Sequence, residues 1–417
     1  MTVRRVMGTE TEYAVSAPAV SYANPVQLSF DVIGAAADPE RSRIRWDYRQ
    51  EDPVNDARGT RLERAAARPD MLTDEPQLNI VNVIAPNGGR MYVDHAHPEY
   101  SAPETTDPFE AVRYDHAGDL LMRRAAASAS ARTGHDIVLH RNNVDGKGAS
   151  WGTHENYMML RSVPFDTVAA LMTAHFVSRQ IYAGSGRVGI GERSETAGYQ
   201  LSQRADYIHA ILGLQTTFER PIVNTRDESH SPSDYRRLHV IVGDANRMDV
   251  PQTLKLGATS MLLWLAEHAD ETGYDLAALL DSMALVDPVS AMHTVSHERQ
   301  WIWRRWQNSN TGRDRRRSSS WTVCGRCRRW ASCWAAKAGM TRPRPFSRHW
   351  KMQRVWRKSG GAKQWIELFE KTKTSVDLVV RCVAGTYLRC ADLRRGGAQR
   401  QDRVHGTELF VLGDSVL

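Results

Sequence analysis

The chain has 417 residues, of which 41% are hydrophobic and 25% are charged. This length and composition predict one large or two medium domains with a substantial buried core, and they exclude gross disorder and a collagen-like chain. The sequence has no run of about 18 apolar residues, and two glutamates lie near its start, where a signal peptide needs an apolar stretch. Five cysteines, an odd number, fit a reducing compartment. We therefore expect a cytoplasmic protein that has no membrane partner.

The net charge of +7 is the average of two different compositions. Residues 299–417 hold 27 Lys+Arg and 8 Asp+Glu, a balance of +19, whereas residues 1–298 are acidic, at −12. The tail also holds all five cysteines and nine of the twelve tryptophans. A solvated basic tail is ordinarily poor in aromatic residues, and this mixture is typical of GC-rich DNA read in the wrong frame. We hypothesise that the tail is out of frame; the alternative is a genuine basic tail.

Up to about residue 297 the chain alternates strand and helix patterns. Apolar and polar residues alternate in the predicted strands, and the predicted helices have capping residues, such as Asp107 before Pro108 and a left-handed Gly184 at the end of 164–182. In chain order we predict a strand over 90–94, a helix over 108–132, strands over 136–141 and 155–160, a helix over 164–182, a strand over 238–242, and helices over 252–270 and 275–285. The elements lack a regular strand–helix–strand rhythm, so we predict an α+β fold and no doubly wound sheet.

Paired glutamates mark the first candidate site, in Gly8-Thr-Glu10-Thr-Glu12-Tyr13. Residues two apart on a strand project from the same face. Two carboxylates on one face repel each other unless a cation lies between them, and Mg²⁺, which prefers oxygen ligands, is the natural candidate. The alternative is a pair of surface glutamates on an edge strand.

A second group of candidate site residues lies on the strand predicted over 90–94 and directly after it. Arg90, Tyr92 and Asp94 share one strand face, and Glu99 comes after a turn that contains a proline. A guanidinium beside carboxylates suits a phosphate ligand with its cation. His95 and His97 suggest zinc only weakly, because no third ligand is evident.

Two later segments place further polar residues at the ends of predicted strands, whereas a glycine motif between them does not indicate a site. His154-Glu-Asn156 follows the glycine-rich stretch 142–152, and Arg236-Arg-Leu-His239 comes later. Residues 184–189 match G-x-G-x-x-G, but no long helix follows them, so we do not expect a dinucleotide site. Because the positive charge is confined to the tail, we do not expect nucleic acid as a partner.

These segments together resemble the ligase and deamidase family of Pup, the prokaryotic ubiquitin-like protein, within the glutamine-synthetase-like carboxylate–amine ligase group. The resemblance covers residues 4–297, and the tail resembles nothing in that family. The segments that support it are GTETEY (8–13), YVDHAHPEYSAPE (92–104), NNVDGKGASWGTHENY (142–157), SGRVGIG (185–191), SQRADYI (202–208), NTRDESH (224–230) and RRLHVIVGDAN (236–246).

Within the family, the sequence resembles the deamidase branch more than the ligase branch. Residues 38–80 resemble an insertion loop that the deamidases have and the ligases lack, and the DHAHPEY spelling around Asp94 is also similar to that of the deamidases. The resemblance implies a glutamine-synthetase-like domain over 1–298, in which a curved antiparallel sheet packed on helices holds ATP and Mg²⁺ on its concave face. The tail, 299–417, then stands in place of the family's small C-terminal domain.

The resemblance also implies roles for individual residues. It implies a metal shell of Glu10, Tyr92, Glu99, His154 and His239. It implies nucleotide contacts at Arg90, Ser101, Ala102, Asn156 and Arg237. Asp94 is implied as the catalytic acid–base or as the nucleophile, and the sequence leaves that choice open.

The activity implied is ATP- and Mg²⁺-dependent hydrolysis of a side-chain amide. In the deamidase branch this reaction converts the C-terminal glutamine of Pup to glutamate and cleaves the isopeptide bond between Pup and a target lysine. The partners implied are Pup and pupylated proteins. The alternatives are a Pup–protein ligase and a non-catalytic, Pup-binding remnant that lost its C-terminal domain to the frame change. The oligomeric state is not implied.

Overall fold

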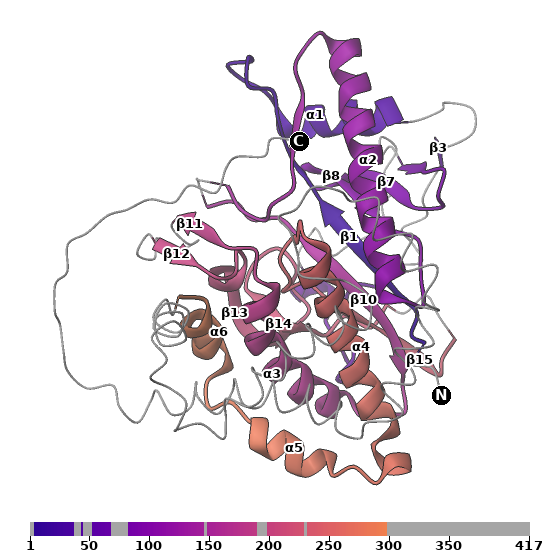
Figure 1. The fold of residues 1–417 in the computed structure, drawn as a ribbon, viewed down its shortest axis with the longest axis vertical. Helices are drawn as coiled ribbons and strands as arrows, with labels where there is room; N and C mark the ends of the chain where they lie inside the picture. The colour runs from indigo at the N-terminus through magenta and orange to yellow at the C-terminus, as the bar shows by residue number, and fades with distance from the viewer. Residues whose placement is uncertain are drawn as a thin grey trace, which may run out of the picture. The chain divides into compact units, whose positions relative to one another are not determined.

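The computed structural model describes residues 4–36, 43–44, 52–67, 82–145, 148–189, 198–228 and 232–297 (Figure 1). All of them belong to one unit of the chain. The tail, 299–417, and most of the predicted insertion loop lie outside the described residues, so the predicted domain boundary and the frame change stay predictions. None of the described helices is long and apolar enough to cross a membrane.

Seven strands form one sheet in which every pair of neighbours is antiparallel. Its order is β15 (Tyr235–Val240), β10 (Thr153–Leu160), β1 (Met7–Glu12), β8 (His97–Ser101), β7 (Arg90–Asp94), β6 (Asn82–Ile84) and β3 (Arg43–Ile44). The strand predicted over 90–94 is confirmed, and those over 155–160 and 238–242 are confirmed with shifted ends. The sheet lies beside helices, as the predicted α+β fold requires.

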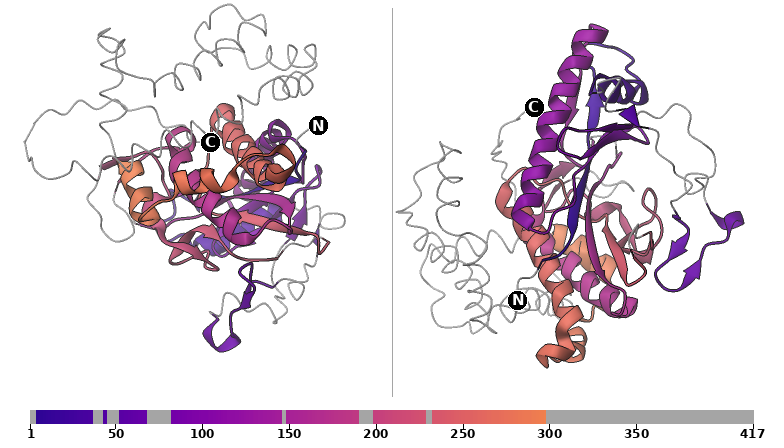
Figure 2. Two further views of the ribbon diagram at one scale, coloured as in Figure 1. Left: turned by 90° about the horizontal axis from the view of Figure 1, so that it is seen from below. Right: turned by 90° about the vertical axis from the view of Figure 1, so that its right-hand side faces the viewer.

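Three helices cover one face of this sheet: α1 (Pro25–Ala36), α2 (Pro108–Thr133) and α4 (Asp249–Thr272). Figure 2 shows α2 running along the strands, which curve beside it. Met91, Val93 and Tyr100 point from β7 and β8 into the core between sheet and helices, where they pack with Val32 and Ile33 of α1. The opposite face of the sheet is therefore left for polar residues.

The predicted cap of α2 is confirmed. The Asp107 carboxylate accepts hydrogen bonds from the backbone N–H groups of Phe109 and Glu110, and Gly134 ends the helix in the left-handed conformation. Behind the sheet, Thr9 and Thr11 of β1 donate their hydroxyls to the Asp115 carboxylate of α2. These bonds fix which face of β1 meets the helix.

A second group of elements packs beside α4. It contains α3 (Phe165–Ala183), α5 (Leu276–Met283), α6 (Pro288–His297), the parallel pair β13 (Ile208–Gly213) and β14 (Arg220–Asn224), and the antiparallel pair β11 (Arg187–Gly189) and β12 (Gly198–Gln200). Sequence patterns predicted α3, α4 and α5 but not α1 or α6. The G-x-G-x-x-G stretch leads from α3 into β11, the reverse of the strand-to-helix order of a dinucleotide site.

The left-handed cap predicted at Gly184 is wrong. Gly184 ends α3 with φ −70° and ψ 139°, an extended conformation that any residue adopts. Glycine is needed there for space, because an added Cβ would lie 2.3 Å from the carbonyl oxygen of Leu201. The glycine therefore permits a close backbone approach.

Two short strand pairs complete the described elements. β2 (Ala14–Ser16) pairs with β9 (Val138–His140), inside the strand predicted over 136–141. In the predicted insertion loop, β4 (Asn55–Asp56) pairs with β5 (Thr60–Arg61) and is followed by the short helix η2 (Arg64–Ala66). This hairpin is bonded to the segment directly after β14, where Thr225 donates its hydroxyl to the Asp56 carboxylate at 2.9 Å. A further short helix, η4 (Ala205–Tyr207), precedes β13.

Candidate functional site

Polar side chains from five strands lie on the sheet face opposite the helices. Residues directly opposite each other in an antiparallel pair project from the same face. Glu10 lies opposite His154 on one side and Ser101 on the other, and Ser101 lies opposite Arg90. The pairs Tyr92–Glu99, Glu99–Glu12 and Asn156–His239 extend this face in both directions. Of the predicted site residues, ten share this face, and only Ala102 does not.

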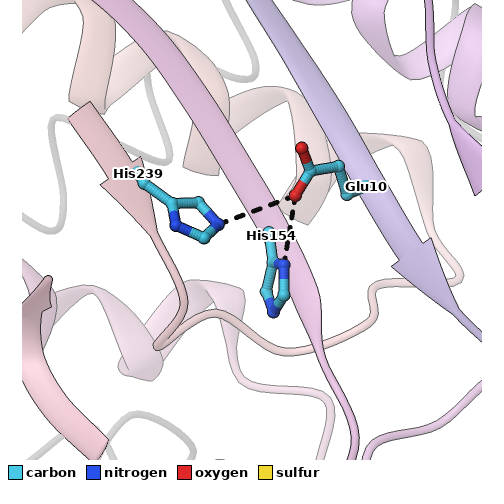
Figure 3. Close-up of side chains that lie close together, drawn as sticks. All are labelled: Glu10, His154 and His239. Atoms are coloured by element: carbon cyan, nitrogen blue, oxygen red, sulfur yellow. Dashed lines mark hydrogen bonds and ion pairs between the residues drawn. The ribbon is translucent and has the colours of Figure 1, made fainter. Parts of the chain in front are cut away.

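Glu10, His154 and His239 form the first cluster, in which their ligand atoms lie within 4.8 Å of one another (Figure 3). The Glu10 Oε2 atom lies 3.2 Å from His154 Nδ1 and 3.6 Å from His239 Nε2. The two imidazole rings meet edge to face, with their centroids 5.0 Å apart. Three strands, β1, β10 and β15, each supply one of these side chains.

The charges in this cluster suit a metal ligand set. Burial opposes ionisation of Glu10, but the imidazoles of His154 and then His239 beside it hold the pKa of Glu10 well below its ordinary value. Burial lowers the pKa of His239 to about 3, so its imidazole is neutral, the form that binds metals. Both ring nitrogens of this buried histidine lack a hydrogen-bond partner among the described residues.

Glu12, Asp94 and Glu99 form a second cluster, which contains only carboxylates and whose ligand atoms also lie within 4.8 Å of one another. Tyr92 donates its hydroxyl to Glu99 Oε1 at 2.5 Å. Burial, followed by the charges of Asp94, Glu10 and Glu12, raises the pKa of Glu99 well above its ordinary value. The cluster therefore holds more negative charge than it can keep without a cation or a proton.

Asp94 is the most exposed member of this cluster, since 37% of its side chain is accessible. Its Oδ1 atom lies 3.1 Å from His95 Nδ1. Burial opposes ionisation, but the hydrogen bond and charge of His95, and then the charge of His154, lower the pKa of Asp94 below its ordinary value. Asp94 is thus an ionised carboxylate that a ligand can reach.

The predicted pair of glutamates does share one face of β1, but the two belong to different clusters. The metal shell expected from the family resemblance is likewise divided, because Glu10, His154 and His239 lie in one cluster and Glu99 with Tyr92 in the other. His95 and His97 are absent from both clusters. The His97 ring lies against Trp151, with centroids 5.5 Å apart.

The residues predicted to contact the nucleotide lie between and beside the two clusters. Arg237 donates to the Asn156 amide oxygen at 2.8 Å, and its Nη1 atom lies 3.9 Å from Glu10 Oε1. The Arg90 guanidinium lies 3.9 Å above the Tyr92 ring centroid. Ser101 lies 3.4 Å from the Tyr92 hydroxyl.

Ala102 differs from the other predicted site residues. Its side chain packs against the core, and its backbone N–H donates to Thr9 O at 2.8 Å within the sheet. The other polar group through which Ala102 could contact a ligand is its backbone carbonyl.

Three supporting residues were not predicted from the sequence. Asn82, 1% exposed, accepts a hydrogen bond from Arg90 Nε at 2.8 Å and so orients that guanidinium. The carbonyl of Glu228 accepts from Arg237 Nε at 2.9 Å. Gly152 leaves room for the His154 ring, since a Cβ there would lie 2.1 Å from His154 Nε2. Glu12 was noted in the paired-glutamate motif, and its two-residue spacing from Glu10 was the signal.

Comparison with known proteins identifies relatives of this chain. The family model described as Pup-ligase protein matches residues 5–381, so the match extends beyond residue 297, where the resemblance was expected to end. A Pup deamidase/depupylase from Mycolicibacterium smegmatis is 49% identical over 302 residues, which are 71% of this chain and 59% of that protein. A Pup–protein ligase from Bifidobacterium dentium is 39% identical over 230 residues, 53% of this chain and 46% of that protein. The chain thus spans about three fifths of the deamidase's length.

A solved structure extends the likeness to the fold. The complex between Pup and its ligase PafA contains a chain that matches with a TM-score of 0.54 and 26% identity, covering 95% of this chain and 71% of that one. The expected glutamine-synthetase-like arrangement, a large antiparallel sheet packed on helices, is confirmed by this match together with the sheet described above.

Proposed function

The chain belongs to the Pup-ligase protein family, and on that premise we propose that it hydrolyses the side-chain amide of Pup's C-terminal glutamine and the isopeptide bond between Pup and a target lysine. Both bonds join the side-chain carbonyl of one residue to nitrogen, so one site serves both. The greater identity to a Pup deamidase/depupylase, 49% against 39% for a ligase, supports hydrolysis over ligation.

The observation that best supports hydrolysis is the position of Asp94. Its carboxylate is ionised and accessible, and it lies on the same sheet face as two groups of cation ligands. An amide carbonyl that enters this face would meet a nucleophile or base, and cations held by these ligands would supply positive charge beside it. That combination is what amide hydrolysis requires.

We further propose that the reaction uses ATP and Mg²⁺. Glu12 and Glu99 of the carboxylate cluster fit Mg²⁺, because both offer carboxylate oxygens; burial, and then the charges of Asp94, Glu10 and Glu12, raise the pKa of Glu99, which a bound cation would offset. Arg90 and Arg237 are the proposed contacts to phosphate oxygens, with Ser101 and Asn156 as neutral partners. Mg²⁺, when bound, supplies positive charge that offsets the phosphates and the oxygen of an attacked amide.

The protein's own groups account for the remaining steps. Asp94 either removes a proton from water, whose oxygen then attacks the amide carbon, or attacks that carbon itself to form an anhydride that water opens. In both routes the carbon–nitrogen bond breaks and the nitrogen leaves as ammonia or as the lysine amine, after taking up a proton. His95, at 3.1 Å, orients the Asp94 carboxylate.

Pup and pupylated proteins are the proposed partners, and a cytoplasmic location fits this role. The ligase reaction is the first alternative, because the matched solved structure is a Pup ligase. A non-catalytic Pup binder is the second, because the chain spans about three fifths of the deamidase's length.

Two mixtures separate the three functions: the full chain with ATP and Mg²⁺ is given either glutamine-ended Pup and a pupylated target, or glutamate-ended Pup and an unmodified target. Deamidated Pup and a freed target indicate the proposed hydrolase, new conjugates from glutamate-ended Pup indicate the ligase, and bound but unchanged Pup indicates the remnant.

Asp94→Asn tests the proposed role of this residue. We expect a loss of about 10²–10⁴-fold in hydrolysis, with ATP binding within a few-fold of the parent. The exposed Asp136→Asn is the matched control and should behave as the parent. Hydrolysis that persists in purified Asp94→Asn would remove Asp94 from the mechanism.

A further inference from the structure

The nitrogen that leaves the amide needs a proton, because an unprotonated amide nitrogen is too basic to depart. In the route in which Asp94 attacks the amide carbon directly, its carboxylate is bonded to that carbon and has no proton to give. In the route through water, Asp94 acts at the oxygen that attacks, whereas the proton is needed at the nitrogen. A proton donor beside Asp94 completes both routes.

His95 lies where such a donor is required. Its Nδ1 atom is 3.1 Å from Asp94 Oδ1, and 52% of its side chain is accessible, so a ligand that reaches Asp94 also reaches the ring. The carbon and nitrogen of an amide are only about 1.3 Å apart. Two groups in contact with each other can therefore act on both ends of this bond.

The other imidazoles on this sheet face make different contacts. The two in the first cluster both lie beside Glu10, with nitrogens 3.2 and 3.6 Å from its Oε2 atom. The His97 ring lies against Trp151, and 23% of its side chain is accessible. The printed geometry thus places the more accessible ring of His95 beside Asp94.

His95 also occupies a backbone position that disfavours a side chain. It opens the two-residue connection between β7 and β8 with φ 51°, in the left-handed region where glycine is the ordinary residue. Among the described residues, Glu219 is the other non-glycine residue with positive φ, at 45°. Residues held in this region are concentrated at active sites, where the role of the side chain maintains the strain. The turn therefore keeps an imidazole beside Asp94 where glycine would fit with less strain.

We propose that His95 is the general acid that protonates the leaving nitrogen. This inference rests on the proposed hydrolysis and assigns one of its proton transfers. As the carbon–nitrogen bond breaks, its electron pair stays on nitrogen, which takes the Nε2 proton of the imidazolium, while Nδ1–H stays bonded to Asp94. In the water route, Asp94 then loses the proton that it took from water, and the imidazole regains one through solvent. In the direct route, the neutral imidazole takes a proton from the water that opens the anhydride, so both groups return to their starting forms.

The test compares two leaving groups on the full chain with ATP and Mg²⁺. The first substrate is glutamine-ended Pup, whose leaving nitrogen must be protonated. The second is Pup whose C-terminal glutamate carries a γ-ester of 4-nitrophenol, because nitrophenolate leaves without a proton. The rate of uncatalysed ester hydrolysis is subtracted.

Two variants remove the acid while keeping the turn. In His95→Asn, asparagine tolerates the left-handed conformation and offers Asp94 an N–H group, but it has no acidic proton. In His95→Gly, glycine removes the side chain and relieves the backbone strain. The exposed Glu219→Gly is the matched control, because it makes the same backbone change at the other position. Far-UV circular dichroism establishes that each variant is folded.

We expect both His95 variants to lose about 10²–10⁴-fold in turnover of the amide and to stay within about 10-fold of the parent on the ester. Glu219→Gly should behave as the parent on both substrates. Amide turnover at the parent's rate in His95→Asn, or equal losses on amide and ester, would overturn the proposal while the parent's hydrolysis stands. A parent that cleaves neither substrate would overturn the proposed function, and this inference with it.

Discussion

Gly152→Ala should disable the cluster of Glu10, His154 and His239, although it replaces none of these three residues. The backbone φ of Gly152 lies outside the left-handed region, so alanine fits the main chain. The new methyl group, however, would lie 2.1 Å from His154 Nε2 and within 3 Å of two ring carbons. Ordinary contacts of a Cβ begin at 3.4 Å, so the imidazole has to move by more than 1 Å.

The magnitude follows from how little room the ring has. The His154 side chain is only 11% exposed and lies against the His239 ring, so it cannot simply turn into solvent. Overpacking of this kind costs about 1–3 kcal/mol in the free energy of unfolding. A ligand displaced by about 1 Å lowers the performance of a positioned site by about 100-fold. We therefore expect a modest loss of stability and a large loss of cation affinity.

The assays are urea unfolding followed by circular dichroism, and a titration of the metal-free full chain with Co²⁺ followed by its visible absorption. Gly257→Ala in α4 is the matched control, since its added Cβ would meet its nearest atom, Pro108 Cγ, at 3.8 Å. It should leave cation affinity unchanged and should stabilise the helix by about 0.5–1 kcal/mol.

A double-mutant cycle with His154→Ala decides whether the clash is the cause. If the methyl group acts by displacing the ring, Gly152→Ala should cost little once the ring is gone, and the coupling free energy should be about 0.5–3 kcal/mol. An equal cost in both backgrounds would refute the reasoning and would assign the effect to the loop backbone instead.

Three further predictions concern stability. Glu155→Gln removes the charge that binds Arg179 through two hydrogen bonds of 2.6 and 2.8 Å behind the sheet, and urea unfolding should show a loss of about 3–5 kcal/mol. His116 lies 2.9 Å from Asp249 Oδ1, and its hydrogen bond with Asp119 raises the pKa of His116. Protonated His116 should therefore contribute about 0.5 kcal/mol to the free energy of unfolding below about pH 6.5, and this contribution should vanish as the pH rises further. When unfolding is measured from pH 5 to 9, His116→Gln should lack this trend. The tail is predicted from composition to be out of frame, so limited proteolysis of the full chain should cut near residue 300; a protease-resistant tail that unfolds together with the body would contradict this.

Each stability variant has an outcome that would contradict its reasoning. Parent-like stability of Glu155→Gln would mean that the amide keeps enough of the Arg179 bonds to offset the lost charge. For His116, a difference from the parent that stays constant across the pH range would exclude titration of the imidazole as its source.

The sequence by itself predicted which candidate residues share one face of their strand. Alternation along a strand is a local property, so the pattern alone assigns Arg90, Tyr92 and Asp94 to one face, and the spacing of Glu10 and Glu12 does the same for β1. The cap at Asp107 is equally local, because its carboxylate bonds residues two and three positions ahead.

Only the tertiary structure decided how these residues are grouped. The pairing of β1 with β10 and β8 placed Glu10 beside His154 and Glu12 beside Glu99, and so divided one expected metal shell into a nitrogen-rich cluster and an all-oxygen cluster. The need for glycine at 152 and 184 was likewise invisible locally, because it depends on the His154 ring and on a Leu201 carbonyl brought close by the fold. Strand register and the close approach of two chain segments both depend on residues far apart in the chain, so local sequence patterns predict neither.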